Sequence, residues 1–473
     1  MGVVGALSVF VAGGVALCLA ALLVRSLLRS QRALGASWRV GVFHPFCDAG
    51  GGGERVLWFA VAALLELEPG LRVQVYAREA DSDGAAVLAR AQQRFGLALR
   101  AEDAARVSFV ALRSARLLEA SLYPRLTLVG QSVGSVVVGA EALWRGGRPD
   151  VFLDTMGYAF TYPLAWLCGA EVACYTHYPT ISSDMLQRVY ERRPAYNNDA
   201  LVSGSVINSR AKYAYYVAFC AAYRLAGAFA RAVAVNSSWT RNHIEQLWRC
   251  KPVVVFPPCD VREFARAAAP RRRRAVVSLG QFRPEKDHRL QIAAMALLAA
   301  RRRQRGLPDD SLPPLLVFGS CRDSEDQALL DGLRAFAHAQ GVAHRVQFRV
   351  NEPFAVLKHE MGHALLGIHT MWNEHFGIAP VEMMAAGIVL VAHASGGPKE
   401  DIVAEGAGFL AASAQEYALA MDKVLDLYDD AGGDQCPELA RIRDNALRSV
   451  QRFTQDKFVD AFKRFMRVLI PAT

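Results

Sequence analysis

Short apolar runs alternate with longer stretches of helical periodicity along most of this chain. Continuous apolar runs are typical of strands buried on both faces by helices, as in parallel sheets. The pattern therefore predicts strands joined by right-handed helical crossovers. Thirteen strands are expected, at Arg39–Phe43, Leu71–Tyr76, Val107–Ala111, Leu126–Val129, Val151–Leu153, Val172–Tyr175, Ala232–Val235, Val253–Phe256, Ala275–Leu279, Leu315–Phe318, Val346–Phe348, Ala364–Ile368 and Val389–Ala392.

These strands are too many for one open sheet of usual size, so we expect two sheets in two domains. Turn residues from Pro257 to Asp260, and an Ala- and Arg-rich segment ending at Pro270, separate the two groups of strands. The fold class is therefore α/β, with two Rossmann-like domains facing a cleft at the carboxyl ends of their strands. The expected parts are an N-terminal domain over residues 38–260, a C-terminal domain over 274–450 and a packing helix over 451–473.

The first segment, residues 1–28, is expected to be a transmembrane helix that anchors the protein. No residue from Gly2 to Val24 is charged, and a run of that length spans a hydrocarbon core of about 30 Å. Arg25, Arg29 and Arg32 follow the run and nothing basic precedes it, which places the rest of the chain on the cytosolic side. The alternative, a cleaved signal peptide, would have a basic start and a shorter apolar core.

Two further segments have apolar character suited to helices. Tyr213–Tyr223 is too short to span a membrane, and it suits either a helix in the membrane interface or a buried core helix. The tail should form a packing helix, because its apolar residues recur at helical spacing. Those tail residues are Phe458, Phe462, Phe465 and Val468.

Composition narrows the class of protein. The chain has 473 residues, of which 52% are hydrophobic, so a large core is expected rather than disorder. A net charge of +9 suits an anionic partner such as phosphate, nucleic acid or a lipid surface. Arginines cluster at residues 271–274 and 301–305, where they suit either a solvated surface or such a partner. Nine cysteines without a CxxC pair argue against disulfides and zinc, and favour a reducing, cytosolic setting.

The first candidate site is the glycine run Gly50, Gly51, Gly52 and Gly53. It follows an expected strand and precedes the apolar helix Val56–Leu67. Successive glycines let backbone N–H groups approach a ligand closely, so a phosphate or a sugar hydroxyl could bind there. A flexible surface turn is the alternative. The run is neither GxGxxG nor a P-loop, which disfavours a dinucleotide oxidoreductase and a nucleoside-triphosphate hydrolase.

The second candidate is the loop from Gly280 to His288. An expected strand ends at Leu279 and a helix is expected to begin near Asp287. Arg283 and Lys286 therefore lie at the carboxyl end of a strand, where they could neutralise a diphosphate. Loop arginines and lysines are also commonly solvated, so this pair alone does not identify a site.

The third candidate runs from Trp372 to Gly387 and carries two carboxylates. Glu374 precedes an expected helix, and Glu382 lies within it eight residues later. Backbone N–H groups of Phe376, Gly377 and Ile378 at the helix start could receive a leaving diphosphate. The carboxylates would then accept hydrogen bonds from sugar and ribose hydroxyls, because carboxylates beside an anion are otherwise costly.

A capped core helix with incidental acids is the alternative for this third segment. A fourth segment, Ser395–Glu400, gives another glycine turn after a strand. It suits either a contact with the sugar or phosphate, or a plain surface turn.

These motifs resemble the large family of retaining glycosyltransferases with two Rossmann-like domains, the B-type glycosyltransferase fold. The Glu374-x7-Glu382 pattern and the Pro284-Glu285-Lys286 loop carry the general resemblance. Longer motifs are similar to the alpha-1,2-mannosyltransferases of asparagine-linked glycosylation, from about residue 39 to about residue 460. These motifs are His44–Trp58, Asp154–Phe160, Thr176–Pro179, Asn236–Thr240 and Gly280–His288.

The resemblance implies a role for each matching residue. Lys286 would contact the donor diphosphate, Glu374 the donor sugar and Glu382 the ribose. His177 matches a histidine near the reacting sugar. The family usually has arginine where this chain has Gln281, and Arg283 is expected to supply the missing charge from two residues on. The resemblance makes the first domain the acceptor domain and the second the nucleotide-sugar donor domain.

The activity implied by the resemblance is retaining transfer of mannose from GDP-mannose to a dolichol-diphosphate-linked oligosaccharide. The linkage would be alpha-1,2, for the fourth and fifth mannoses, on the cytosolic face of the endoplasmic reticulum membrane. Expected partners are these two substrates, the membrane and other glycosyltransferases of the same pathway. No cofactor and no metal are expected, because Asp81 and Asp83, which have DxD spacing, lie in a loop away from the other motifs.

Three alternatives remain at this stage. An enzyme of the same fold could act on another lipid acceptor, such as phosphatidylinositol. A catalytically silent membrane scaffold would have lost its site residues, yet Lys286, Glu374 and Glu382 are all present. A nucleic-acid partner is suggested by charge alone, because the basic clusters lack interleaved aromatic residues.

Overall fold

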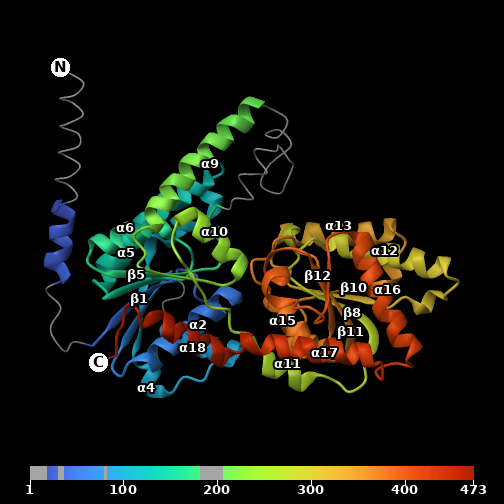
Figure 1. Ribbon diagram of the computed structural model, residues 1–473. Coiled ribbons are helices and arrows are strands. Elements are labelled where there is room, and N and C mark those ends of the chain that lie inside the picture. The colour runs from blue at the N-terminus through green and yellow to red at the C-terminus, as the bar shows by residue number, and fades with distance from the viewer. Residues whose placement is uncertain (1–18, 30–36, 79–82, 182–205, 473) are drawn as a thin grey trace. The chain divides into compact units, whose positions relative to one another are not determined.

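The computed structural model describes residues 19–29, 37–78, 83–181 and 206–472, without side chains for 206–211. The chain divides into two compact units. Unit 1 comprises Met1–Asn236, Thr240–Val255 and Val459–Thr473, and unit 2 comprises Ser237–Trp239 and Phe256–Phe458. Each unit contains one parallel sheet with helices on its faces (Figure 1).

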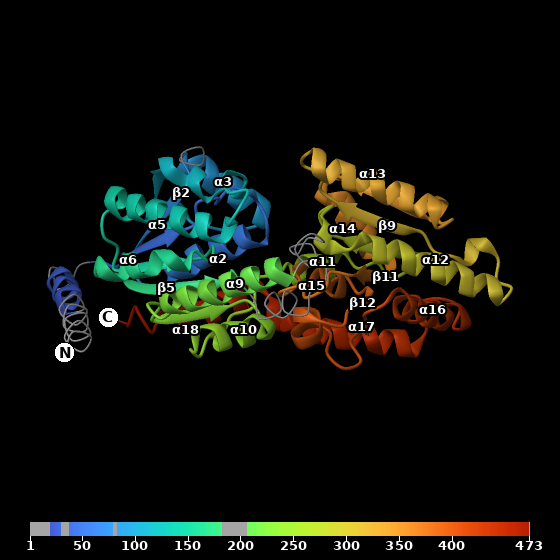
Figure 2. The ribbon, with the colours of Figure 1, turned by 90° about the horizontal axis from the view of Figure 1, so that it is seen from above.

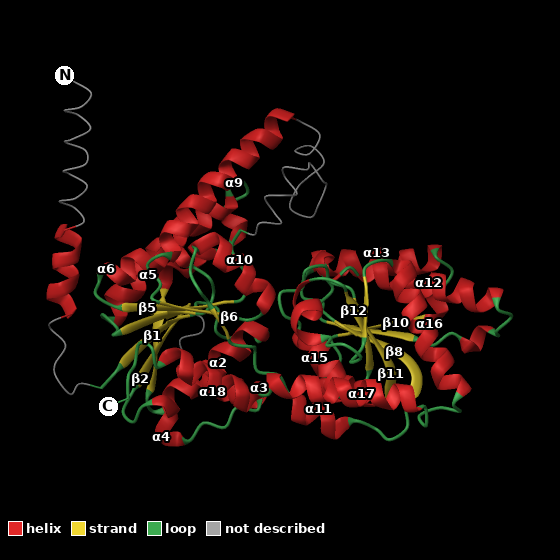
Figure 3. Ribbon diagram, viewed as in Figure 1, coloured by secondary structure: helices red, strands yellow, loops and turns green. Residues whose placement is uncertain are grey.

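The sheet of unit 1 has seven strands in the order β3-β2-β1-β4-β5-β6-β7. In Figure 3, α2, α4 and α18 lie on one side of this sheet, and α5, α6 and α9 lie on the other. The strands are β1 (Arg39–Phe43), β2 (Arg72–Arg78), β3 (Val107–Leu112), β4 (Val151–Asp154), β5 (Glu171–Thr176), β6 (Ala232–Val235) and β7 (Val253–Val254). The helices are α2 (Gly52–Leu67), α3 (Gly84–Phe95), α4 (Ala101–Ala104), α5 (Thr127–Gly146), α6 (Tyr162–Leu167), α9 (Val206–Gly227) and α10 (Ser238–Trp248). Helix α18 (Gln455–Met466) begins in unit 2, and the part from Val459 onward belongs to unit 1.

The sheet of unit 2 has six strands in the order β10-β9-β8-β11-β12-β13. These strands are β8 (Arg273–Leu279), β9 (Leu315–Gly319), β10 (Val346–Val350), β11 (Ala364–His369), β12 (Val389–His393) and β13 (Phe409–Ala411). The helices are α11 (Val261–Ala267), α12 (His288–Gln304), α13 (Ser324–Ala339), α14 (Phe354–His363), α15 (Ile378–Ala385), α16 (Ala414–Asp430) and α17 (Pro437–Val450).

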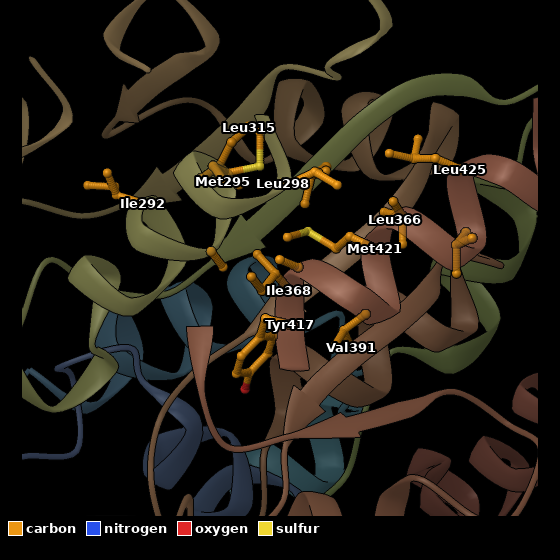
Figure 4. Packing of buried hydrophobic residues seen from close by; sticks show 14 of the residues in the cluster. Ile292, Met295, Leu298, Leu315, Leu366, Ile368, Val391, Tyr417, Met421 and Leu425 are labelled. Atoms are coloured by element: carbon orange, nitrogen blue, oxygen red, sulfur yellow. The ribbon is translucent and has the colours of Figure 1, made fainter. Parts of the chain in front are cut away.

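The core of unit 2 lies where α12 and α16 cover the sheet. Met295 and Leu298 of α12 and Met421 of α16 meet Leu366 and Val391 of the strands (Figure 4). All five side chains are fully buried. Burial of this kind contributes about 25 cal/mol per Å² of apolar surface. This layer therefore stabilises the packing of α12 and α16 against β11 and β12.

Twelve of the thirteen expected strands are confirmed, with ends that differ by up to two residues. The expectation of a strand at Leu126–Val129 is wrong. Leu126 has a left-handed backbone (φ 54°) and directly precedes α5, which begins at Thr127. The apolar residues continue at helical spacing through this helix, and the short window did not distinguish the two periods. The strand β13 at Phe409–Ala411 was not anticipated.

The tail forms the expected helix, α18, with one correction. Phe458, Phe462 and Phe465 are buried, as the spacing predicts. Val468 is 60% exposed, because the helix ends at Met466 and the stripe is not continued.

The arginine cluster at residues 301–305 is not simply a solvated surface. The Arg302 side chain is 3% exposed and donates to Asp422 Oδ1 at 2.9 Å and to Asp429 Oδ2 at 3.1 Å. Arg301 and Arg305 also pair with Asp422. These ion pairs join the C-terminal end of α12, with the following residue Arg305, to α16. An anionic partner is therefore not needed to explain this cluster.

Most of the expected anchor, residues 1–18, lies outside the described residues, as does Asp81. Residues 19–29 are helical. Within the described parts of the chain, no helix is both long enough and apolar enough to cross a bilayer.

Candidate functional site

The site of unit 2 lies where the strand order reverses. Strands β8 and β11 are neighbours, while the chain continues outward from them to β9 and β12. The loops that leave these two strands therefore diverge, and such a point is where ligands bind in open α/β sheets. Lys286 lies in the loop after β8, and Glu374 lies in the loop after β11.

The structure brings Lys286 and Glu374 together. The Lys286 Nζ atom lies 2.7 Å from Glu374 Oε2 and 3.1 Å from Met371 Sδ. The side chains are 23% and 14% exposed, so the pair is accessible but largely shielded from water. An ammonium in this position can neutralise a phosphate, and the neighbouring carboxylate can accept hydrogen bonds from hydroxyls.

A buried histidine lies against this ion pair. His369 Nε2 lies 3.4 Å from Glu374 Oε2, at the end of β11. Burial alone would raise the pKa of Glu374, but attraction to Lys286 and the contact with His369 outweigh it and hold the pKa well below its usual range. Burial lowers the pKa of His369, against the opposing effect of Glu374. Glu374 is therefore a carboxylate, and sequence reasoning did not anticipate His369.

A second set of contacts holds the Lys286 loop. Thr370 Oγ1 lies 2.8 Å from the carbonyl oxygen of Lys286 and 3.1 Å from that of Asp287, and its proton is shared between them. Gln291 Nε2 donates to the same hydroxyl at 2.9 Å. His288 Nε2 lies 3.1 Å from the carbonyl oxygen of Gln281. These buried polar residues fix the backbone that carries Lys286, and no motif in the sequence pointed to Thr370 or Gln291.

The Glu374 loop is positioned by the glycine turn after β12. The backbone N–H of Asn373 donates to Ser395 Oγ at 2.7 Å, and that of Gly397 donates to the Glu374 carbonyl at 2.8 Å. Gly396 has a φ of +63°, and a Cβ there would lie 2.3 Å from the Glu374 carbonyl oxygen. The Ser395–Glu400 segment thus supports Glu374, so it is more than a plain surface turn.

The helix after Glu374 begins as expected. Gly377 has a φ of +112° and directly precedes α15, which starts at Ile378. Phe376 is buried against the rings of Phe256 and Phe453, so only its backbone can face a donor. Glu382 lies within α15 and is buried, which confirms its expected place in the helix.

Arg283 and Gln281 have contacts of their own within the Gly280–His288 loop. Arg283 Nη1 lies 3.8 Å from Glu285 Oε1, and the side chain of Arg283 is about one-third exposed. Gln281 uses its backbone carbonyl to hold His288. Gln281 therefore helps to fix the conformation of the loop. That Arg283 supplies the positive charge which the family usually has at position 281 stays a prediction.

Unit 1 has its own reversal of strand order, between β1 and β4. His44 follows β1, and its Nδ1 atom lies 2.7 Å from Thr155 Oγ1, just after β4. Its Nε2 atom lies 3.5 Å from Glu54 Oε1. Burial opposes ionisation of Glu54, but the hydrogen bonds from His44 and Gly51 outweigh it and lower the pKa of Glu54. The side chain of Glu54 is therefore an ionised carboxylate, and it lies next to the glycine run.

The glycine run differs in detail from the expectation. Helix α2 begins at Gly52, so Gly52 and Gly53 are helical, and Gly50 alone has a left-handed φ of +76°. The N–H of Gly51 donates to Glu54 Oε2 at 2.5 Å. Because an anionic carboxylate occupies this N–H, a sugar hydroxyl suits the loop better than a phosphate does.

His177 lies beside this loop. It follows β5, and a Cβ built on Gly53 would lie 3.8 Å from His177 Nε2. The adjacent strand end carries Asp154, which is fully buried and accepts from the Tyr162 hydroxyl at 2.7 Å and from the N–H of Met156 at 2.9 Å. The structure thus gathers His177, Gly53 and Glu54 at one end of the unit-1 sheet.

Two Rossmann-like units, each with one parallel sheet between layers of helices, are the architecture of the B-type glycosyltransferase fold. Solved structures agree with this fold. A glycosyltransferase from Rickettsia africae aligns with a TM-score of 0.60 at 12% identity, over 92% of this chain and 100% of its own. Anabaena HepE in complex with UDP and glucose aligns with a TM-score of 0.59 at 16% identity, over 91% of this chain and 100% of its own.

The family follows from sequence comparison. Residues 37–248 match the family described as ALG11 mannosyltransferase N-terminus, and residues 261–447 match glycosyl transferases group 1. Relatives named GDP-Man:Man(3)GlcNAc(2)-PP-Dol alpha-1,2-mannosyltransferase are 43% identical in Xenopus tropicalis, over 89% of this chain and 85% of theirs, and 41% identical in Homo sapiens, over 96% and 93%. The chain belongs to this alpha-1,2-mannosyltransferase family and is a glycosyltransferase.

Proposed function

We propose that this enzyme transfers mannose from GDP-mannose, with retention of configuration, to a dolichol-diphosphate-linked oligosaccharide. The linkage formed is alpha-1,2, and the fourth and fifth mannoses are added in succession. The names of the relatives support both substrates. The observation that carries the chemistry is the 2.7 Å pair of Lys286 and Glu374 at the strand reversal of unit 2.

In the proposed reaction, the bond between mannose C1 and the diphosphate oxygen breaks and its electron pair stays on GDP. The acceptor hydroxyl forms the new bond to C1 on the same face, and its proton passes to the departing diphosphate. Lys286, with the start of α15, stabilises the charge on that diphosphate. Glu374 orients the mannose hydroxyls and Glu382 the ribose. The transition state has oxocarbenium character, as in glycoside hydrolysis.

Unit 1 supplies the acceptor side of this proposal. His177 and the Glu54 carboxylate beside Gly51 and Gly53 offer hydrogen-bonding groups suited to sugar hydroxyls. The uncharged run Gly2–Val24, followed by arginines, supports a single-pass anchor with the rest of the chain on the cytosolic face of the endoplasmic reticulum. That setting would place the enzyme where a lipid-linked acceptor is found.

The test is mass analysis of lipid-linked oligosaccharide after incubation of the purified full chain with GDP-mannose. The trimannosyl acceptor should gain two hexoses, and a Glu374→Ala variant that remains folded should add none. Transfer to phosphatidylinositol, with none to the dolichol-linked acceptor, would support the alternative lipid acceptor instead. A fully active Glu374→Ala variant would exclude the proposed role of the Lys286–Glu374 pair.

A further inference from the structure

A cavity of about 350 Å³ opens at the amino ends of the unit-1 strands. Among its lining residues, Asp150 precedes β4, Glu171 begins β5 and Arg231 precedes β6. These strands run parallel, so the three residues lie at the end of the sheet opposite to His177, which follows β5. The volume is within the usual range for a small-ligand site, about 300–1,000 Å³. The cavity is therefore separate from the candidate site of unit 1 and large enough for a ligand.

Two ends of the chain help to form this cavity. Arg29 comes from the helix over residues 19–29, and Val468, Leu469 and Pro471 come from the segment after α18. Figures 1 and 2 show this helix and the C-terminal end of the chain at the same end of unit 1. The cavity thus combines segments that are far apart in the sequence, and no sequence motif indicated it.

Three arginines share one carboxylate in the wall of the cavity. Glu171 Oε1 accepts from Arg29 Nη1, and also from Arg25 Nη2 at 3.1 Å. The other oxygen, Glu171 Oε2, lies 3.3 Å from Arg231 Nη1. The Glu171 side chain is only 10% exposed, so it is largely shielded from water. A single carboxylate balances only one of these three positive charges.

The other charged residues around the cavity do not remove this surplus. Arg148 also lines the cavity, and its Nη1 atom donates to the carbonyl oxygen of Leu28. Asp150 Oδ2 accepts from the backbone N–H of Arg39 at 2.9 Å. Four arginines therefore face two carboxylates, which leaves an excess of two positive charges. The arginines are Arg25, Arg29, Arg148 and Arg231, and the carboxylates are those of Asp150 and Glu171.

Two of these arginines can still bind a ligand. The side chain of Arg29 is 47% exposed and that of Arg231 is 56% exposed. A guanidinium carries five N–H donors, so each keeps donors beyond those directed at Glu171. A phosphate group fits this arrangement best, because guanidinium groups bind phosphate oxygens in pairs and a dianion would balance the excess charge. An uncharged sugar would leave that excess in place.

We propose that this cavity binds a phosphate group between Arg29, Arg148 and Arg231. The group can come from a soluble diphosphate. It can also come from a phospholipid headgroup, because the helix over residues 19–29 continues the uncharged run Gly2–Val24. The lipid source rests on the proposed membrane anchor, whereas the site itself is independent of the proposed transfer reaction. A bound phosphate would bridge Arg29 to Arg231 and so hold this helix against unit 1.

Arginine footprinting tests the site at the level of single residues. Phenylglyoxal modifies exposed guanidinium groups, and peptide mass spectrometry measures the rate at each arginine of the full chain in neutral detergent. Pyrophosphate at about ten times its Kd, compared with sodium chloride of equal ionic strength, should slow the modification of Arg29 and Arg231 by about tenfold, because roughly one molecule in ten is then unbound. Arg262 is the control, because it is 71% exposed and pairs with Asp456, so its rate should not change.

Vesicles separate the two sources of the phosphate group. Protection of Arg231 by pyrophosphate supports the site with a soluble ligand. Protection by vesicles of phosphatidylcholine with phosphatidic acid, but not by phosphatidylcholine alone, supports the site with a lipid ligand. No protection under any of these conditions, equal protection at Arg262, or protection by both kinds of vesicle to the same extent with none by pyrophosphate would overturn the proposal.

A substitution in the cavity should weaken this binding. Arg231→Gln should raise the Kd of pyrophosphate, measured through the protection of Arg29, by roughly 10- to 100-fold, because a charged hydrogen-bonding group is lost. Arg25 and Arg29 keep their contacts with Glu171 in this variant, so the helix over residues 19–29 stays attached. Arg262→Gln is the matched control and should leave the Kd unchanged. An unchanged Kd in Arg231→Gln would overturn the proposal.

A third variant separates this site from the proposed transfer reaction. Lys286→Met removes the lysine of the donor site in unit 2 and should leave the protection of Arg29 and Arg231 unchanged. Loss of that protection in Lys286→Met would assign the effect of pyrophosphate to the donor site and would contradict a separate cavity. Protection without any mannose transfer by the unaltered chain would contradict the proposed activity and still support this site.

Discussion

Lys286 Nζ lies 2.7 Å from Glu374 Oε2, although 88 residues separate the two in the chain. One belongs to the loop after β8 and the other to the loop after β11, and the adjacency of these strands brings them together. The pair holds a positive and a negative charge at the strand reversal of unit 2. Each charge is therefore available to a different part of a nucleotide sugar.

Removing the charge of Lys286 should affect the chemical step more than it affects folding. We expect Lys286→Met to lower kcat by roughly 100- to 1,000-fold, because it removes a group that stabilises the leaving diphosphate. Steady-state kinetics with GDP-mannose measure this loss. Glu374→Gln is the matched variant, and the double variant should lose less than the sum of the two losses in free energy, because the two residues contact each other. Additive losses would contradict a functional pair.

Substituting Gly396 should displace the Glu374 loop. The added Cβ of Gly396→Ala would lie 2.3 Å from the Glu374 carbonyl oxygen, so the loop must move. Gly432 has a similar φ of +67° and nothing within 4 Å of a built Cβ, which makes Gly432→Ala a matched control for backbone strain. The control should lose about 1–2 kcal/mol of stability and keep its activity. Gly396→Ala should lose stability and nearly all transfer; equal behaviour of the two variants would be a contrary result.

The Thr370 hydroxyl should matter through the position of Lys286. Thr370→Val keeps the shape of the side chain but removes the hydrogen bonds to the carbonyls of Lys286 and Asp287 and the one from Gln291. We expect a fall in kcat of roughly 10- to 100-fold, because small shifts of reacting groups are costly. Thr370→Ser should restore most of the rate. Failure of serine to restore it would show that packing, and not hydrogen bonding, is the role of Thr370.

Stability should fall as the pH drops below about 6.5. Burial lowers the pKa of His288, His369 and His393 from their ordinary value of 6.5. Below that value the unfolded chain binds protons that the folded chain does not, so the free energy of unfolding decreases. Glu374 affects stability only at lower pH. Its pKa is lowered in the folded protein, so its contribution to stability is lost as the pH falls below 4.5, the ordinary pKa of the carboxyl group.

Thermal melts between pH 7.5 and 5.5 measure this effect. The His369→Gln variant should show a shallower decline of melting temperature than the unaltered chain. The same slope in both proteins would exclude His369 as a contributor.

The buried Arg302 should be a structural residue of unit 2. Arg302→Met removes its ion pairs with Asp422 and Asp429 and should reduce the free energy of unfolding by about 3 kcal/mol. Arg303→Met, at an exposed position of the same helix, is the control and should change stability little. Chemical denaturation measures both variants. Transfer activity per folded molecule should be equal in the two, and a selective loss in Arg302→Met would indicate a role beyond packing.

Much of the architecture could be predicted from local sequence. Buried parallel strands are continuous apolar runs, and glycine and proline mark their ends, so β1, β8 and β12 were located from composition and period alone. Lys286, Glu374 and Glu382 were found because they lie at such ends or within the following helix. The strand predicted at Leu126–Val129 was wrong because the prediction used the same local signal. A short apolar window fits a strand and a helix equally well.

The tertiary structure decided which of these residues meet. Sheet order places β8 beside β11, and only that order turns two loop residues into the Lys286–Glu374 pair. The roles of His369 and Thr370 also became visible only in the structure. Whether a side chain is buried, and which way it points, depends on the neighbouring strands. Local periodicity specifies elements, whereas contacts between distant residues depend on how those elements pack.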